Sequence, residues 1–191
     1  IYLDEGSSGM LVENNLVYDC SSQTFHQHYG KDNIIRNNIF ANQIRTQLEA
    51  SRFEEHLSFS FTNNIVCYHT GVMCGINWTR VGHKSDYNSY FCTDLSQQIS
   101  FQGMSFDEWK QKGQDHNSVI ANPEFANAEA GDFTPKNKAL LKKIGFKMFD
   151  YTKAGVYGSK EWQRKAELSS EMKAAFDKLV NDYEQQVITD W

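Results

Sequence analysis

Ile35-Arg36-Asn37-Asn38-Ile39-Phe40 decides the fold, because its two asparagines followed by two apolar residues recur along the chain. The further copies are Asn14-Asn15-Leu16-Val17, Asn63-Asn64-Ile65-Val66 and, in degenerate form, Tyr87-Asn88-Ser89-Tyr90. The second asparagines stand at 15, 38, 64 and 88, so the steps are 23, 26 and 24 residues. Such steps suit a coil of three short strands and their turns, whereas TPR and ankyrin repeats are longer and helical. The repeat therefore predicts a parallel β-helix.

Columns of similar residues support this stacking of coils. Three residues before the second asparagine stand Val12, Ile35 and Phe61, and the two positions after it carry Leu16, Ile39 and Ile65, then Val17, Phe40, Val66 and Tyr90. Asparagine tolerates left-handed backbone at the corners of a coil, and its amides can bond from coil to coil. Stacked strands lie about 4.8 Å apart, so Glu13 and Arg36 are expected to be neighbours across two coils.

Beyond residue 92 the repeat fades, and other signals take over. Ser105 and Glu108 form the two ends of a predicted capping box, with Met104 and Trp109 spaced for a hydrophobic staple. Gly113 is expected to end this helix. Short strand-and-turn pieces are expected at residues 123–125 and 131–133.

The expected domain organisation is a body over residues 1–158, made of β-helix coils with a loop-rich end, and a tail over residues 159–191. The tail is expected to be one amphipathic helix from Ser159 to about Val187 that packs on or caps the solenoid. Its apolar face would carry Met172, Phe176, Leu179, Val180, Tyr183 and Val187. Because an uncovered end of a parallel coil invites edge-to-edge pairing, we expect the chain to be the C-terminal portion of a longer β-helix, whose N-terminal part is its partner.

Composition argues against some classes of partner and leaves the thiols open. The formal net charge is −5 and no block of Lys and Arg occurs, so nucleic acid is not an expected partner. No apolar run has the roughly eighteen residues of a membrane span. The four cysteines, Cys20, Cys67, Cys74 and Cys92, lack zinc-finger spacing and are expected to be buried free thiols. A disulfide from Cys67 to Cys74 or to Cys92 remains an alternative.

Several stretches together resemble secreted bacterial right-handed parallel β-helix proteins that degrade polysaccharides. They are residues 1–9, 36–40, 86–90, 107–125, 131–133, 144–147 and 154–158. The nearest group is glycoside hydrolase family 141, whose activities include fucosidase and xylanase action on plant cell-wall glycans. The chain departs from the usual pattern at Asn122-Pro123 and at residues 137–140, where relatives carry Asp-Pro and Asp-Ser-Pro-Ala.

This resemblance implies an all-β, right-handed parallel β-helix of the pectate-lyase-like kind. It also implies an enzyme, a glycoside hydrolase acting on plant or other complex polysaccharides or oligosaccharides. The expected location is secreted, periplasmic or on the cell surface of a bacterium.

Glycoside hydrolysis needs two carboxyl groups that flank the scissile bond. Asp4 and Glu5 directly precede a Gly-Ser-Ser-Gly turn, where a site on the outer face of the coils is expected. Counting ten residues back from the second asparagines aligns Glu5 with His28 and Glu54, which predicts a polar column along one edge. Asp4, Glu5 and His28 are therefore the predicted catalytic residues.

The predicted substrate-binding residues are His26, Arg45, Glu49, Arg52, Glu54 and Trp78. His26 shares a strand face with His28, and the pair could serve sugar hydroxyls, acid–base chemistry, a metal or structure. Because no third ligand is placed, no metal or cofactor is expected. Residues 45–56 are expected to be a charged loop lining the cleft, while Trp78 and Tyr29 could stack on sugar rings or simply pack.

Two other functions compete with hydrolysis. A polysaccharide lyase would use a cation such as calcium and a basic residue, for which Lys31, Arg45 and Arg52 are available, but no cluster of aspartates resembles a calcium site. A non-catalytic glycan-binding or surface β-helix is the third class, and it predicts that Asp4 and Glu5 are dispensable.

Overall fold

The computed structural model describes residues 1–75 and 77–189, without the side chains of residues 180 and 183–189. It consists of two units, Ile1–Phe149 and Asp150–Trp191.

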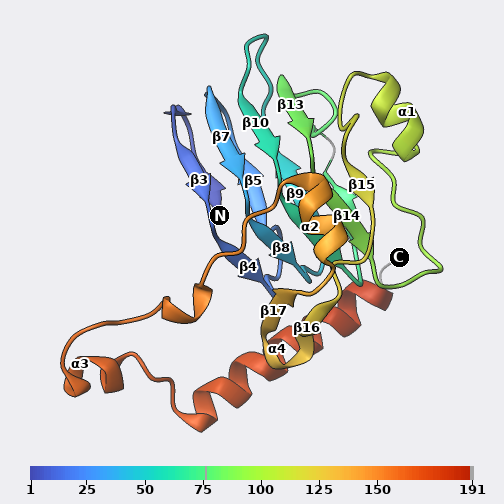
Figure 1. Cartoon of the computed structure of the whole chain (residues 1–191). Coiled ribbons are helices and arrows are strands. Elements are labelled where there is room, and N and C mark those ends of the chain that lie inside the picture. The colour runs from blue at the N-terminus through green and yellow to red at the C-terminus, as the bar shows by residue number, and fades with distance from the viewer. Residues whose placement is uncertain (76, 190–191) are drawn as a thin grey trace. The chain divides into compact units, whose positions relative to one another are not determined.

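The first unit is a parallel β-solenoid of about four turns, as the repeat predicts (Figure 1). One sheet consists of β1 (Tyr2–Leu3), β5 (Phe25–Gln27), β9 (Thr46–Ala50) and β12 (Val72–Cys74). A second consists of β3 (Leu11–Glu13), β7 (Asn33–Arg36), β10 (Phe59–Thr62) and β13 (His83–Asp86). A third consists of β4 (Leu16–Tyr18), β8 (Ile39–Ala41), β11 (Ile65–Tyr68), β14 (Ser89–Cys92) and β15 (Val119–Ile120), and the short strands β2 (Ser7–Ser8) and β6 (Gly30–Lys31) pair beside them. Three strands per coil account for the length of the repeat.

The predicted columns are confirmed by the strand register. Val12 pairs with Ile35, and Ile35 pairs with Phe61. Glu13 and Arg36 form the expected contact between coils, with 2.7 Å between Arg36 Nε and Glu13 Oε2. Like side chains therefore lie over like along the solenoid.

A ladder of asparagine side chains runs along one corner of the coils, fully buried at Asn38, Asn64 and Asn88 and half-buried at Asn15. The residue before each ladder asparagine has left-handed backbone: Asn14, Asn37, Asn63 and Tyr87, with φ of 54–58°. The Oδ1 of Asn64 accepts from both the backbone N–H and the side-chain amide of Asn38, each at 3.0 Å. Its Nδ2 donates to the carbonyl of Ile35, 3.0 Å away. Asn15 and Asn88 repeat this pattern, so each coil donates to the next one.

The ladder ends on Asp115, whose side chain is 1% exposed. Its carboxylate accepts from Asn88 Nδ2 at 3.0 Å and from Trp109 Nε1 at 2.8 Å. Further donors are the hydroxyls of Ser85, Tyr90 and Ser118. Neutral donors thus surround a buried carboxylate at the last coil.

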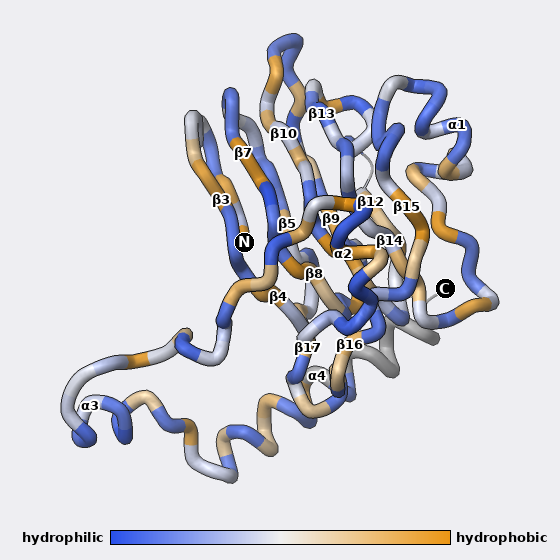
Figure 2. Tube along the Cα trace, viewed as in Figure 1, coloured by the Kyte–Doolittle hydropathy of each residue, from blue (hydrophilic) through white to orange (hydrophobic). Residues whose placement is uncertain are grey.

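Two apolar cores hold this unit together. Inside the solenoid lie the aromatic side chains of Phe25, Phe40, Phe59, Phe61, Trp78 and Tyr90. A second core lies on the outer face of the third sheet, where Ile39 and Ile65 meet Phe133, Leu140 and Ile144. The covering elements are β16 (Phe125–Asn127), η1 (Ala128–Ala130), β17 (Asp132–Pro135) and α2 (Lys138–Ile144). The expected strand pieces near residues 125 and 133 are thus confirmed, and they pair as a hairpin. Figure 2 shows hydrophobic residues along the strands of the solenoid.

Helix α1 (Phe106–Gln111) also begins as predicted, with a capping box between Ser105 and Glu108. Gly113 follows the last turn with φ of 88°. All four cysteines are free thiols; Cys67, Cys74 and Cys92 are buried and Cys20 is half-buried. The alternative of a disulfide to Cys67 is therefore not observed.

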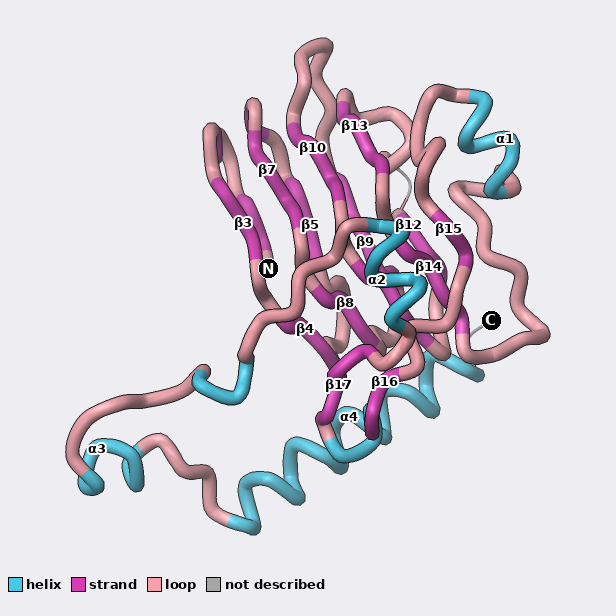
Figure 3. The backbone as a smooth tube through the Cα atoms, in the orientation of Figure 1, coloured by secondary structure: helices cyan, strands magenta, loops and turns pink. Residues whose placement is uncertain are grey.

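The second unit corrects the prediction of one continuous tail helix. It contains η2 (Tyr151–Lys153), α3 (Lys160–Lys165) and α4 (Ser170–Thr189) (Figure 3). The break arises because Ser169 caps a new helix, with its hydroxyl accepting from the N–H of Met172 at 3.2 Å. Met172, Phe176 and Leu179 are exposed, while the side chains of Val180, Tyr183 and Val187 lie outside the described residues. Among the described helices, none has the length and apolar character needed to cross a membrane.

Candidate functional site

A polar surface covers the outer face of the first sheet. Alternation along β5 and β9 directs Phe25 and Leu48 into the solenoid, where both are fully buried, and turns the intervening side chains outward. Tyr2, His26 and Glu49 form one outward row, because His26 pairs with Tyr2 on one side and with Glu49 on the other. The strands that carry this row lie beside one another in the solenoid (Figure 1).

Asp4 and His28 interact at the end of these strands. The Oδ1 of Asp4 lies 3.2 Å from His28 Nδ1 and accepts from the hydroxyl of Tyr2 at 2.9 Å. The pKa of Asp4 is lowered by a hydrogen bond from the backbone of Glu5, then by those from Tyr2 and His28. Glu5 lies at the margin of this group, with its Oε1 3.8 Å from His28 Nδ1. The structure thus brings together the three predicted catalytic residues.

Glu49 has the opposite electrostatic environment. Its carboxylate lies over Gly75, the residue that follows the neighbouring strand β12, so that a Cβ at Gly75 would stand only 1.8 Å from Glu49 Oε2. Burial raises the pKa of Glu49, and a hydrogen bond from the Ala50 backbone and the charge of Arg45 only partly oppose this. Glu49 therefore favours the protonated acid more than an exposed glutamate does.

His26 lies between these carboxyl groups. Its Nε2 is in contact with the hydroxyl of Ser51, and its ring centroid lies 4.7 Å from that of Tyr2. Burial lowers the pKa of His26, and the charge of His28 lowers it further. The neutral imidazole is thus favoured, which can accept or donate a hydrogen bond to a hydroxyl.

The predicted column of Glu5, His28 and Glu54 is wrong in its register. Gln27 pairs with Leu3 on one side and with Ala50 on the other, so Asp4 and Ser51, rather than Glu5 and Glu54, stand beside His28 in the column. The longer coil has its extra residues after β9, which shifts any count made from the second asparagine. Glu54 instead pairs with His56 at 3.4 Å.

The expected loop over residues 45–56 is also corrected, because its first half is strand β9. Leu48 and Ala50, two residues apart, are buried inside the solenoid, and Gln47 between Thr46 and Leu48 is buried as well, so the segment belongs to the sheet. The loop proper begins at Ser51, and Arg52 lies over the ring of Tyr29, 4.5 Å from its centroid. Arg45 precedes the strand and is exposed.

Trp78 does not belong to the site. It is 0% exposed and its ring lies 5.3 Å from Phe59 and 5.5 Å from Phe61 inside the solenoid. Three residues of this surface, Tyr2, Ser51 and Gly75, were not predicted from the sequence. Tyr2 could have been found, because strand alternation places it on the same face as Asp4. The positions of Ser51 and Gly75 in the site depend on the register between strands, which the sequence does not reveal.

Within the described residues, no group of three or more His, Cys, Asp or Glu side chains is arranged to hold a metal ion. No protein-family model, curated protein or solved structure matches the chain.

Proposed function

We propose that this chain forms part of a glycoside hydrolase in which Glu49 is the general acid and Asp4 the general base. The observation that carries the proposal is that two carboxyl groups face outward from one sheet in different surroundings: Asp4 is exposed and bonded to Tyr2 and His28, and Glu49 is half-buried over Gly75. Their pKa values are accordingly shifted in opposite directions, raised for Glu49 and lowered for Asp4. An acid and a base in one site need such separation, because one must hold its proton while the other has lost it. His28 would hold the Asp4 carboxylate in place, and His26, Ser51 and Arg52 would contact sugar hydroxyls.

The spacing of the two carboxylates favours inversion of configuration. Asp4 follows β1 and Glu49 lies in β9, the strands on either side of β5. Two strand spacings amount to about 9.6 Å, and Glu49 leans farther away over Gly75, so the two groups lie well beyond the retaining distance and at or above the upper end of the inverting range. Retaining enzymes hold their carboxyl groups about 5–5.5 Å apart and inverting ones about 6.5–9.5 Å apart, leaving room for a water molecule. This water would be activated by Asp4.

The charge of the surface favours a neutral glycan. Asp4 and Glu5 give this end of the row a negative character, which repels the carboxylates of a polyuronate. A neutral plant or other complex polysaccharide is therefore the proposed substrate. The proposal includes a right-handed, pectate-lyase-like solenoid and a secreted, periplasmic or cell-surface location, where such polymers are met.

Product analysis of the Glu49→Gln and Asp4→Asn variants tests this function. We expect the unsubstituted protein to release reducing sugar from neutral xylans or fucosylated glycans, and each variant to lose about 100-fold or more in rate. Glu54→Gln is the matched control and should retain its rate. NMR of the first product should show the inverted anomer.

Other products would overturn the proposal in recognisable ways. An unsaturated uronate would indicate a lyase. Cleavage that both variants retain would remove Asp4 and Glu49 from the mechanism. Binding of glycan without any cleavage would indicate the non-catalytic class.

A further inference from the structure

A second surface, far in sequence from the polar row, carries its own hollow. The pocket has a volume of about 420 Å³ and lies beside β14 and β15, whereas the polar row lies on the first sheet. It is lined by Phe91, Cys92, Leu95, Gln97, Gln98, Ile99, Ser105, Phe106, Asp107 and Ile120. The elements β16, β17 and α2 cover Ile39 and Ile65 of the same sheet and form the second core. Phe91 and Ile120 are not part of that core, and they line the pocket.

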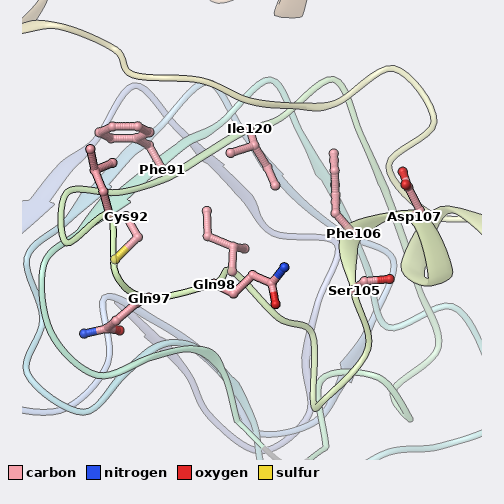
Figure 4. A pocket seen from close by; sticks show the side chains of 10 residues that line it. Phe91, Cys92, Gln97, Gln98, Ser105, Phe106, Asp107 and Ile120 are labelled. Atoms are coloured by element: carbon pink, nitrogen blue, oxygen red, sulfur yellow. The ribbon is translucent and has the colours of Figure 1, made fainter.

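The lining combines an apolar surface with the amide of Gln98, whereas the amide of Gln97 already donates to Asp94 and His69. Figure 4 shows Phe91 and Phe106 on opposite sides of the pocket, with Gln97 and Gln98 along a third side. Leu95 is 83% exposed at this place. Among the described residues, the amide of Gln98 and the carboxylate of Asp107 make no hydrogen bond to another side chain or to the backbone.

We propose that this pocket binds a segment of a neutral oligosaccharide, as a glycan-binding site separate from the polar row. A sugar ring presents C–H groups on its faces, which suit Phe91 and Ile120, and hydroxyls at its edge. Each hydroxyl both donates and accepts a hydrogen bond, and so does the primary amide of Gln98. The lining contains Asp107 and no Lys or Arg, and the ammonium of the nearby Lys110 lies over the ring of Phe106, 4.3 Å from its centroid, so the lining itself offers no cation to a phosphate or carboxylate ligand.

Two further points separate this site from catalysis. Asp107 is the sole carboxylate in the pocket lining, whereas glycoside hydrolysis needs two. The volume falls within the range of about 300–1,000 Å³ that small-ligand pockets occupy. The site would thus hold a chain of the polymer while another part of it lies at the polar row; the choice of a glycan as ligand rests on the proposed function.

The test is titration of the Glu49→Gln protein with xylohexaose and with cellohexaose. Binding is measured by calorimetry and by the NMR chemical shifts of the side-chain amides. Glu49→Gln prevents consumption of the ligand and leaves the pocket intact. We expect shifts at Gln97 and Gln98, and a Kd for the pocket that rises about tenfold or more with Gln98→Ala or Leu95→Lys. Both positions are exposed, so the variants should fold. Gln111→Ala, on the same helix as Phe106 but outside the pocket, is the matched control.

The outcomes separate this inference from the proposed function. Unchanged affinity in both pocket variants, or shifts confined to residues of the polar row, would overturn the pocket assignment even if the protein cleaves glycans. Binding lost in the pocket variants would support the site even if the unsubstituted protein cleaves no glycan. Binding of glucuronic acid oligomers in preference to neutral ones would also overturn it.

Discussion

Two rows of polar side chains run across the coils of this solenoid, one buried and one exposed, and they differ in how their groups are satisfied. In the buried row, each ladder amide donates to the next, and the carboxylate of Asp115 ends the row by accepting from the last amide and from other neutral donors. In the exposed row, the carboxyl groups of Asp4 and Glu49 have pKa values shifted in opposite directions. A buried amide must have all its hydrogen bonds made if the fold is to be stable. Acid–base catalysis instead requires two carboxyl groups with different pKa values. The contrast distinguishes a structural row from a candidate catalytic one.

Breaking the buried row in its middle should have the largest effect. Asn64→Leu leaves the N–H of Asn38 and the carbonyl of Ile35 without their side-chain partners. Each buried polar group left unpaired costs about 1–3 kcal/mol, so we expect a loss of about 4 kcal/mol in the free energy of unfolding. Urea denaturation measures it. Thr62→Ala, half-buried on the outer face two residues earlier, is the control, and an equal loss in both variants would contradict the ladder's role.

Changing the end of the buried row should have a smaller effect. Asp115→Asn replaces one accepting oxygen by an NH₂ group that faces the donors Ser85, Tyr90 and Trp109. We expect a loss of about 2–3 kcal/mol. Asp107→Asn, exposed and nearby, should lose less than about 0.5 kcal/mol in the same thermal or urea measurement. A stabilised Asp115→Asn variant would show that the carboxylate is under-paired.

The exposed row can be altered without touching a titratable group. Gly75→Ala would place its Cβ where the Glu49 carboxylate now lies and drive that carboxylate into solvent. Because burial is the main cause of the raised pKa of Glu49, this pKa should fall toward its ordinary value.

The expected fall in the pKa of Glu49 can be measured from the pH dependence of hydrolysis. If Glu49 must be protonated, activity declines as pH rises through its pKa, and Gly75→Ala should move this decline to lower pH with about a tenfold loss of rate at the former optimum. Stability should change little, since the atoms that the added Cβ meets belong to the end of the flexible Glu49 side chain, which can move aside. A pH profile that stays in place would exclude Glu49 as the acid.

The outer pair of Glu13 and Arg36 should matter least. Their contact at 2.7 Å is partly exposed to solvent, and such pairs contribute about 0.2–1 kcal/mol. Arg36→Ala should therefore lower the unfolding free energy by less than about 1 kcal/mol, and added salt should reduce even this difference. A loss as large as that of Asn64→Leu would place Arg36 among the structural residues.

The sequence predicted the buried row better than the exposed one, for a physical reason. Parallel stacking repeats the corner residues in register, so Asn38 and Asn64 could be aligned by counting from copy to copy. The register of the exposed row depends on where in each coil the extra residues are inserted. In the longest coil they come after β9, so Ser51 stands beside His28 where the count from the asparagines predicted Glu54. Trp78 was misplaced because an aromatic side chain gives no sign of which way it faces.

The asparagine ladder has a direction, since every coil donates to the one that follows it. The amide dipoles therefore add head to tail, and their positive end faces the last coil. Asp115 lies at this end, as an anion lies at the start of an α-helix. The whole row of amides thus helps to solvate a buried negative charge, and an acidic residue is a fitting terminator for a ladder of this polarity.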